Sequence, residues 1–212
     1  MSSVTVRGTA LASVTPDRAH VSLALSHLAA DAATALDEVA ERSQQLESLL
    51  AGLEFEKADW VTEGVQVAEE YQWKNDTNVL VGHRASTAVT VTVRSLDLVG
   101  KVIRDGVTTA GASVRSLVWR VDADNPAHRR LLSEAALDAR LRAQAYVEAL
   151  GLRLGEVELI SEAPIAAEPT PGPQPREMMM AKMAGSDSAE LSVSGGLVEL
   201  NAEVHVRFAI LP

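Results

Sequence analysis

The stretch Val79–Arg94, which reads VLVGHRASTAVTVTVR, decides the fold of this chain. Its apolar residues lie on one face at odd positions, namely Val79, Val81, Ala85, Val89, Val91 and Val93. Polar residues fill most of the positions between them, and such alternation with β-branched residues is typical of a half-buried strand. The stretch is about three times as long as a usual strand, so we expect it to span two packing units and to join them.

Further segments of alternating residues lie on both sides of this stretch. Upstream, residues 60–73 share its pattern, and a polar turn at Lys74–Asn78 separates the two, which predicts a long antiparallel hairpin. At the N-terminus, residues 4–14 and 19–26 alternate around Thr15-Pro16-Asp17, which predicts a second hairpin. Downstream, residues 114–121, 155–161 and 198–210 are predicted to be strands.

Three helices are predicted between these strands. The first follows the N-cap residue Asp31 and ends near Gly52, and the second runs from Ser95 to Gly111. The third begins at Asn125-Pro126, and its expected buried stripe is Leu132, Ala136, Ala139, Ala143, Val147 and Leu150. This order predicts an α+β fold in two linked lobes, with largely antiparallel sheets of long hairpin strands, each covered on one face by helices.

The composition excludes several classes of function. The chain has 212 residues, of which 47% are hydrophobic, which is enough for a substantial core. Its net charge of −10 argues against nucleic acid or an anionic membrane as a partner, because both require a basic surface. The absence of cysteine excludes disulfides, thiolate catalysis and cysteine zinc sites. No apolar segment is long enough to span a membrane or to serve as an export signal, so we expect a cytoplasmic location.

No arrangement typical of catalysis or of cofactor binding stands out. The histidines lack the paired spacing of a zinc helix, although cross-strand pairing of His20 with His205 would bring two metal ligands together. Ser192-Val193-Ser194-Gly195 lacks the first glycine of a nucleophile elbow, and no phosphate loop or dinucleotide fingerprint is found. We therefore expect no catalytic residues, no metal site and no cofactor.

Residues 163–188 differ in composition from the rest of the chain. Five prolines interrupt regular structure, and Met178, Met179, Met180 and Met183 form a cluster. The segment is predicted to be a long flexible loop. Its methionines could bind a soft metal such as Cu(I), scavenge oxidants, or dock on a neighbouring subunit, or they could simply fill the loop.

Four groups of residues together indicate a family. They are Val6-Arg7-Gly8 with Thr15–Ala19, Gly82–Ser86 with Thr90–Val93 and Leu96-Asp97, Ala110-Gly111-Ala112, and the alanine and glycine positions of residues 135–155. In order and spacing they resemble the SIMPL-domain family, bacterial proteins of poorly defined function that include periplasmic immunogenic proteins and an oxidative-stress defence protein. The resemblance covers almost the whole chain. The chain departs from it in showing no secretion signal and in carrying His83 where tyrosine is common.

The resemblance implies one domain over residues 1–212, built as two intertwined lobes, and a tendency to self-assemble, in some members into ring-like or channel-like oligomers. It implies no catalytic residues. Our first hypothesis is therefore a non-enzymatic protein that self-associates into a homo-oligomer and that has a possible role in stress. We expect the terminal strands and the methionine cluster to form its contact surface. The second hypothesis is a small-molecule or peptide binding module with a cleft between the lobes near Trp73, Arg84 and Trp119.

Overall fold

The chain forms two compact units, each with its own antiparallel sheet and core. The computed structural model describes residues 2–74, 76–163 and 195–212. Of these, residues 2–14, 123–163 and 197–212 belong to unit 1, and the remaining ones belong to unit 2. The predicted α+β class with antiparallel sheets is confirmed.

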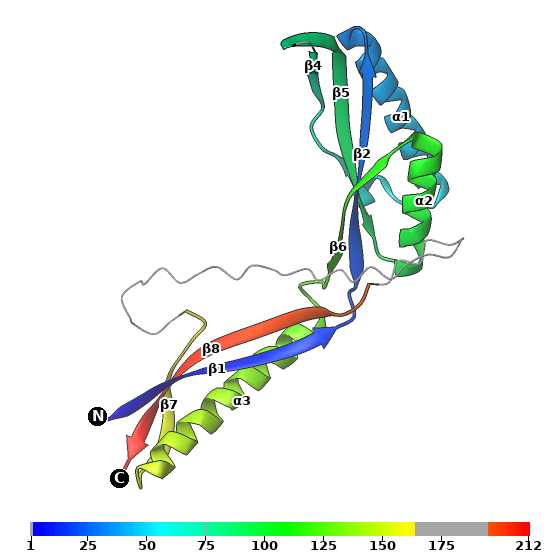
Figure 1. Ribbon diagram of the computed structural model, residues 1–212. Coiled ribbons are helices and arrows are strands. Elements are labelled where there is room, and N and C mark those ends of the chain that lie inside the picture. Colours follow the sequence, from blue (N-terminus) through cyan, green and yellow to red (C-terminus); the bar gives the residue numbers. More distant parts are fainter. Residues whose placement is uncertain (1, 75, 164–194) are drawn as a thin grey trace, which may run out of the picture. The chain divides into compact units, whose positions relative to one another are not determined.

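Unit 1 is a three-stranded sheet covered by one helix. The strands are β1 (Ser3–Val14), β8 (Val198–Leu211) and β7 (Arg153–Ser161), in the order β1-β8-β7. Helix α3 (Pro126–Ala149) runs along β1 and β8 (Figure 1). The two ends of the chain are thereby paired, in a register that runs from Ser3 opposite Ala209 to Val14 opposite Val198.

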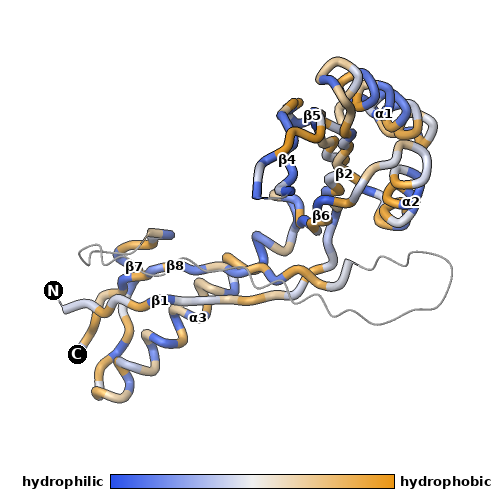
Figure 2. Tube along the Cα trace, turned by 45° about the horizontal axis from the view of Figure 1, so that its top comes forward, coloured by the Kyte–Doolittle hydropathy of each residue, from blue (hydrophilic) through white to orange (hydrophobic). Residues whose placement is uncertain are grey.

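The helix packs on this sheet through a row of small residues. Its buried residues are Ala127, Leu131, Ala135, Ala139, Ala143 and Val147. The predicted stripe was therefore wrong at three positions, since Ala136 is exposed, Leu132 is 46% exposed and Leu150 is 73% exposed. The prediction favoured leucines, whereas a row of alanines lets the helix backbone come closer to the sheet. Figure 2 shows hydrophilic and hydrophobic residues alternating along α3.

Gly8 marks the closest approach between β1 and α3. A Cβ atom at this position would lie 2.0 Å from the carbonyl oxygen of Ala135 and 2.6 Å from the backbone nitrogen of Ala139. Both atoms belong to a helix backbone, which cannot move aside without losing its own hydrogen bonds. The absence of a side chain at Gly8 is therefore a condition for the packing of unit 1.

We predict that Gly8→Ala destabilises the protein by at least about 1–3 kcal/mol, the usual cost of overpacking a core. Denaturant unfolding followed by far-UV circular dichroism measures the loss. The control is Gly52→Ala, because a Cβ atom on Gly52 meets no atom within 4 Å. Equal stability of Gly8→Ala and the unsubstituted chain would contradict the close packing of α3 on β1.

Unit 2 has a larger sheet that two helices cover on one face. Its strands are β2 (Arg18–Ala29), β3 (Trp60–Thr62), β4 (Gln66–Lys74), β5 (Thr77–Val93) and β6 (Ser113–Arg120), in the order β3-β5-β2-β6 with β4 also on β5. The helices are α1 (Ala32–Gly52) and α2 (Val99–Ala110), and two short 3₁₀ helices are Lys57–Asp59 and Leu96–Leu98. Figure 1 shows both long helices on the same side of β2.

The long strand β5 lies entirely within unit 2. The expectation that it joins two packing units was therefore wrong. Its length instead accommodates two partners along one edge, because β3 pairs with residues 89–91 and β4 pairs with residues 77–86. The predicted alternation is confirmed where α1 covers the strand, with Ala85, Val89, Val91 and Val93 fully buried.

The N-terminal segments do not form the predicted hairpin. Strand β1 pairs with β8 in unit 1, whereas β2 pairs with β5 and β6 in unit 2. Thr15-Pro16-Asp17 connects the units instead of closing a hairpin. An alternating pattern of apolar and polar residues indicates that a segment is a strand, but it does not determine which other strand that segment pairs with. The predicted hairpin on either side of residues 74–78 is confirmed, although its first arm is divided into β3 and β4.

Helix termini agree in part with the sequence. The Asp31 carboxylate accepts a hydrogen bond from Thr34 N at 2.9 Å, and the Asn125 side chain accepts one from Ala127 N at 2.9 Å, so both predicted N-caps are confirmed. Ser95 precedes the 3₁₀ turn Leu96–Leu98 and makes no side-chain cap.

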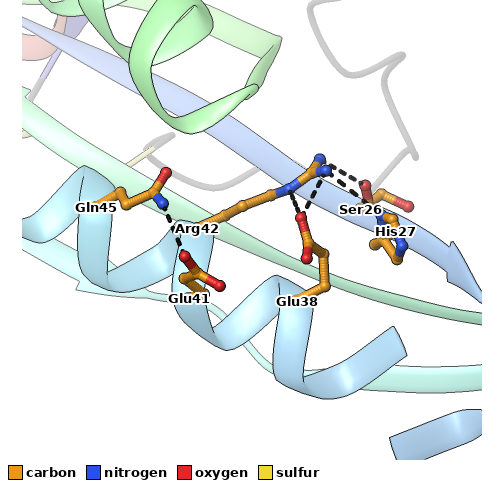
Figure 3. Close-up of polar contacts among 6 residues, drawn as sticks. All are labelled: Ser26, His27, Glu38, Glu41, Arg42 and Gln45. Carbon is orange, nitrogen blue, oxygen red and sulfur yellow. Dashed lines mark hydrogen bonds and ion pairs between the residues drawn. The ribbon is translucent and has the colours of Figure 1, made fainter. Parts of the chain in front are cut away.

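Arg42 connects α1 to the end of β2. Its Nε donates to Glu38 Oε1 at 3.0 Å, and its two terminal nitrogens lie 3.4–3.5 Å from His27 Nδ1 and the Ser26 carbonyl oxygen (Figure 3). The long side chain of Arg42 thus reaches from the helix back to the strand.

Candidate functional site

The face of the unit 2 sheet opposite α1 and α2 carries a polar hollow of about 310 Å³. It is lined by His20 and Ser22 of β2, Thr90 of β5, Arg115, Ser116, Val118 and Arg120 of β6, and Glu63. This volume is at the lower end of the range of small-molecule sites. The hollow is the candidate functional site.

Strand pairing puts these side chains next to one another. On β2, His20 lies opposite Thr92 on one side and Val118 on the other, and Ser22 lies between Thr90 and Ser116. The register of β6 then slips, because Ser116 pairs with Ser22 but Val114 pairs with Leu23. Arg115 is the extra residue of this β-bulge. A bulge re-aims a side chain, and here it brings Arg115 within reach of the open face.

Glu63 links three strands across the hollow. It follows β3, and its backbone is held by two hydrogen bonds, from Glu63 N to the Ala88 carbonyl at 2.7 Å and from the Thr87 hydroxyl to the Glu63 carbonyl at 3.1 Å. Its carboxylate accepts hydrogen bonds from Thr90 Oγ1 at 2.7 Å and from Arg115 Nη1 at 2.8 Å. A longer contact, of 3.5 Å, joins it to Ser22 Oγ.

Five arginines lie on or beside this face of the sheet, and four of them have a carboxylate partner. These pairs are Arg18–Asp122 at 2.8 Å, Arg84–Glu70 at 3.0 Å, Arg115–Glu63 at 2.8 Å and Arg94–Asp59. Within the described part of the chain, the side chain of Arg120 has neither an ion pair nor a hydrogen bond. Of the two guanidinium groups that line the hollow, that of Arg120 therefore has no counter-ion among the described residues.

The positive charges around the hollow act on His20. Burial lowers the pKa of its imidazole below the ordinary value of 6.5, and the nearby charges of Arg18 and Arg120 lower it further, against a smaller opposite effect of Asp122. His20 is consequently neutral at pH 7, when one ring nitrogen donates and the other accepts.

The lining of the hollow combines charged and neutral polar side chains. Guanidinium groups, a neutral imidazole, hydroxyls and one carboxylate offer donors and acceptors to a small polar molecule. In residues 2–74, 76–163 and 195–212, no group of three or more histidine, aspartate or glutamate side chains could hold a metal ion. His20 and His205 cannot pair across strands, because they lie in different sheets.

A family model described as SIMPL, a protein of unknown function (DUF541), matches residues 4–208. The chain belongs to the SIMPL family. Among its relatives is the 26 kDa periplasmic immunogenic protein of Brucella melitensis, 26% identical over 98% of this chain and 84% of the relative. Another is the uncharacterized protein YggE of Escherichia coli, 28% identical over 99% of this chain and 83% of the relative.

The name of the Brucella relative contradicts the cytoplasmic location predicted for this SIMPL chain, and that prediction is therefore wrong. The prediction depended only on finding no export signal among the N-terminal residues. No helix in the described part of the chain is long and apolar enough to cross a membrane.

The three residues predicted to form a ligand site all belong to unit 2 of the SIMPL chain but are separated along its sheet. Arg84 lies opposite Leu28 on β2, and Trp119 lies opposite Ala19, nine positions or about 30 Å along the strand. Trp73 pairs with Asn78, farther out on β5. A ligand cleft between the lobes stays a prediction, and a single small ligand would not touch all three residues.

Sequence reasoning missed Glu63, Arg115 and Arg120. Arg115 stands at an odd position and Arg120 at an even position of β6, so in a regular strand their side chains would point to opposite faces. Only the bulge brings both to one hollow, and nothing in the local sequence marks that bulge. Glu63 has no periodic signal of its own. Met178, Met179, Met180 and Met183 lie outside the described residues.

We predict that Arg120→Gln raises the pKa of His20, because it removes one of the positive charges that disfavour the imidazolium. Histidine side-chain NMR across a pH titration measures the change. Lys101→Gln, which removes one positive charge from α2, is the control and should leave the His20 pKa unchanged.

The lowered pKa of His20 also determines how the stability of the folded chain changes with pH. Between the folded value and 6.5 the unfolded chain binds more protons at His20, so stability is lost as pH falls through this window and regained above 6.5. A His20 pKa that does not respond to Arg120→Gln would contradict the described arrangement.

Proposed function

We propose that this SIMPL-family chain is a non-enzymatic protein of the periplasm that self-associates through the β4–β5 hairpin. The location is supported by the name of the Brucella relative, a periplasmic immunogenic protein. The proposal of a non-enzymatic role is supported by the nature of the candidate site, whose side chains are suited to binding and form no nucleophile–base pair or metal cluster in the described residues. The exposed apolar surface of the hairpin carries the proposal of self-association.

The hairpin extends beyond the part of the sheet that helices bury. Nearly every residue of β4 is exposed, and so are the first five residues of β5. We call Val67, Tyr71, Trp73 and Leu80 the hairpin patch; Tyr71 is 52% exposed and Trp73 65% exposed. Strand pairing puts Tyr71 opposite Leu80, so both side chains point to the same face. Figure 2 shows a hydrophobic segment of β5 beside β4.

The outer edge of β4 is also free of strand partners. Among the described strands β4 pairs only with β5, so its other edge presents unpaired backbone groups that can bind another strand. The edge of β1 differs, because the Asp138 carboxylate on α3 accepts a hydrogen bond from Thr9 N at 2.9 Å. Strand β8 is central in its sheet and has no free edge. Of the terminal strands named as a contact surface, only β1 could contribute an edge.

A second copy of β4 fits this edge in a two-fold antiparallel arrangement. Pairing centred on Glu70 would place Val67 of one copy opposite Trp73 of the other, an aliphatic–aromatic pair that stabilises sheets. The two central Glu70 side chains would not leave uncompensated charge, because each carboxylate binds Arg84 of its own chain at 3.0 and 3.3 Å. That pairing lowers the pKa of Glu70 and keeps both groups ionised.

We expect the Trp73→Ser, Tyr71→Ser double variant to shift the solution mass towards the monomer, because it removes the two aromatic side chains of the hairpin patch. Light scattering of the untagged full chain measures the mass. Leu137→Ser is the control, since Leu137 is 60% exposed on α3, which belongs to unit 1 and not to the unit that carries the hairpin. A monomer before any substitution, or an unchanged mass in the double variant, would contradict assembly through the hairpin.

A cysteine at the centre of the arrangement tests its register. The chain has no cysteine, so Glu70→Cys introduces a single thiol that should form a disulfide between two copies under mild oxidation. Val61→Cys on β3, at a more exposed position than Glu70, should cross-link more slowly.

We also propose, from its composition alone, that the methionine cluster forms a second contact between copies. Deletion of residues 164–194 should lower the assembly mass further if Met178, Met179, Met180 and Met183 dock on a neighbouring copy. Light scattering of the deletion variant decides this. An unchanged mass would limit the contact to the hairpin.

A role in oxidative stress stays a prediction, and faster oxidation of these methionines than of Met1 under peroxide would support it.

A second candidate function is a ligand-binding module, and the polar hollow around Glu63 favours it. All of its lining residues belong to unit 2, so the site does not depend on a cleft between units. Assembly and ligand binding use different parts of the sheet and are compatible in one protein.

A further inference from the structure

Among the residues that the structure describes, Arg120 is the arginine of the open sheet face that has no carboxylate partner, and it lines the hollow. Each of the other four arginines there has a carboxylate within 4 Å. Arg120 shares the hollow with Arg115, which uses Nη1 for Glu63 and has its other nitrogens available. The Ser116 hydroxyl lies between them on the same strand. Donors therefore gather at the β6 side of the hollow.

We infer that this hollow binds a small monocarboxylate that carries a hydroxyl or amino group, with its carboxylate on Arg120. The guanidinium fork matches a carboxylate in a bidentate arrangement, which Arg84 shows on the same sheet with both oxygens of Glu70, at 3.0 and 3.3 Å. The Ser116 hydroxyl and the neutral His20 ring can donate further hydrogen bonds to the ligand. This inference is independent of assembly through the hairpin.

The remaining side chains of the hollow limit the ligand to a single negative charge. Glu63 lies in the hollow and Asp122 pairs with Arg18 beside it, so a dianion such as phosphate would meet nearby negative charge. The Glu63 carboxylate lines the same hollow and can accept a hydrogen bond from a hydroxyl or ammonium group of the ligand. With a volume of about 310 Å³, the hollow has room for a small metabolite rather than a folded partner.

L-lactate is a suitable probe, and lactamide is its neutral analogue. We expect ligand-detected NMR on the full-length protein to show saturable binding of L-lactate and none of lactamide, because only lactate carries the charge that Arg120 requires. Inorganic phosphate should compete poorly.

Substitutions then assign the binding to the hollow. Arg120→Gln should weaken lactate binding at least about tenfold, as expected for loss of charge-assisted hydrogen bonds. Arg120→Lys keeps the charge without the fork and should weaken it less, which also provides a test if the glutamine variant folds poorly. Lys101→Gln removes one positive charge from α2 and should bind lactate as the unsubstituted chain does.

Three results would overturn the inference. The first is equal binding of lactate and lactamide, which would show that charge is not recognised. The second is equal binding of lactate by the Arg120→Gln variant and the unsubstituted chain. The third is a change in solution mass on Arg120→Gln without any detectable lactate binding, which would mean that Arg120 pairs with a carboxylate of a second copy.

Discussion

The pairing of β1 with β8 is the constraint on which the rest of the structure depends. Twelve residue pairs join the first strand of the chain to the last one. Unit 1 can therefore close only after the whole chain has been made, and residues 15–122 form a separate unit before the chain returns to it. Pairing residues so far apart in the chain costs loop-closure entropy, and contacts between neighbouring residues do not offset that cost. The alanine row of α3 and the absence of a side chain at Gly8 stabilise the pairing by letting the helix pack closely on both strands.

The sheet of unit 2 has one face buried by helices and one face left open. The buried face is occupied by valine and leucine side chains from β2 and β5. On the open face, charges are arranged in pairs, so the arginines are largely neutralised without being buried. Exposed ion pairs contribute little to stability. These ion pairs are better explained as shaping a polar surface, and Arg120 is the arginine of this surface that has no such pair among the described residues.

The two candidate surfaces of this SIMPL-family chain offer different kinds of contact. The hairpin presents aromatic side chains and an unpaired strand edge, both suited to another protein chain. The hollow presents compact donors and acceptors, which suit a small molecule. The two surfaces differ in chemistry, and they include different residues.

Local patterning alone determined the elements of this protein: the strand at residues 79–93, the caps at Asp31 and Asn125, and the α+β class. These follow from side-chain periodicity and from backbone groups at helix ends, which act over a few residues. Only the tertiary structure decided that β1 pairs with β8 and not with β2, that α3 uses its alanines and not its leucines, and that Glu63, Arg115 and Arg120 share a hollow. Strand partners and sheet neighbours are set by contacts between residues far apart in the chain, and one bulge is enough to change which side chains meet.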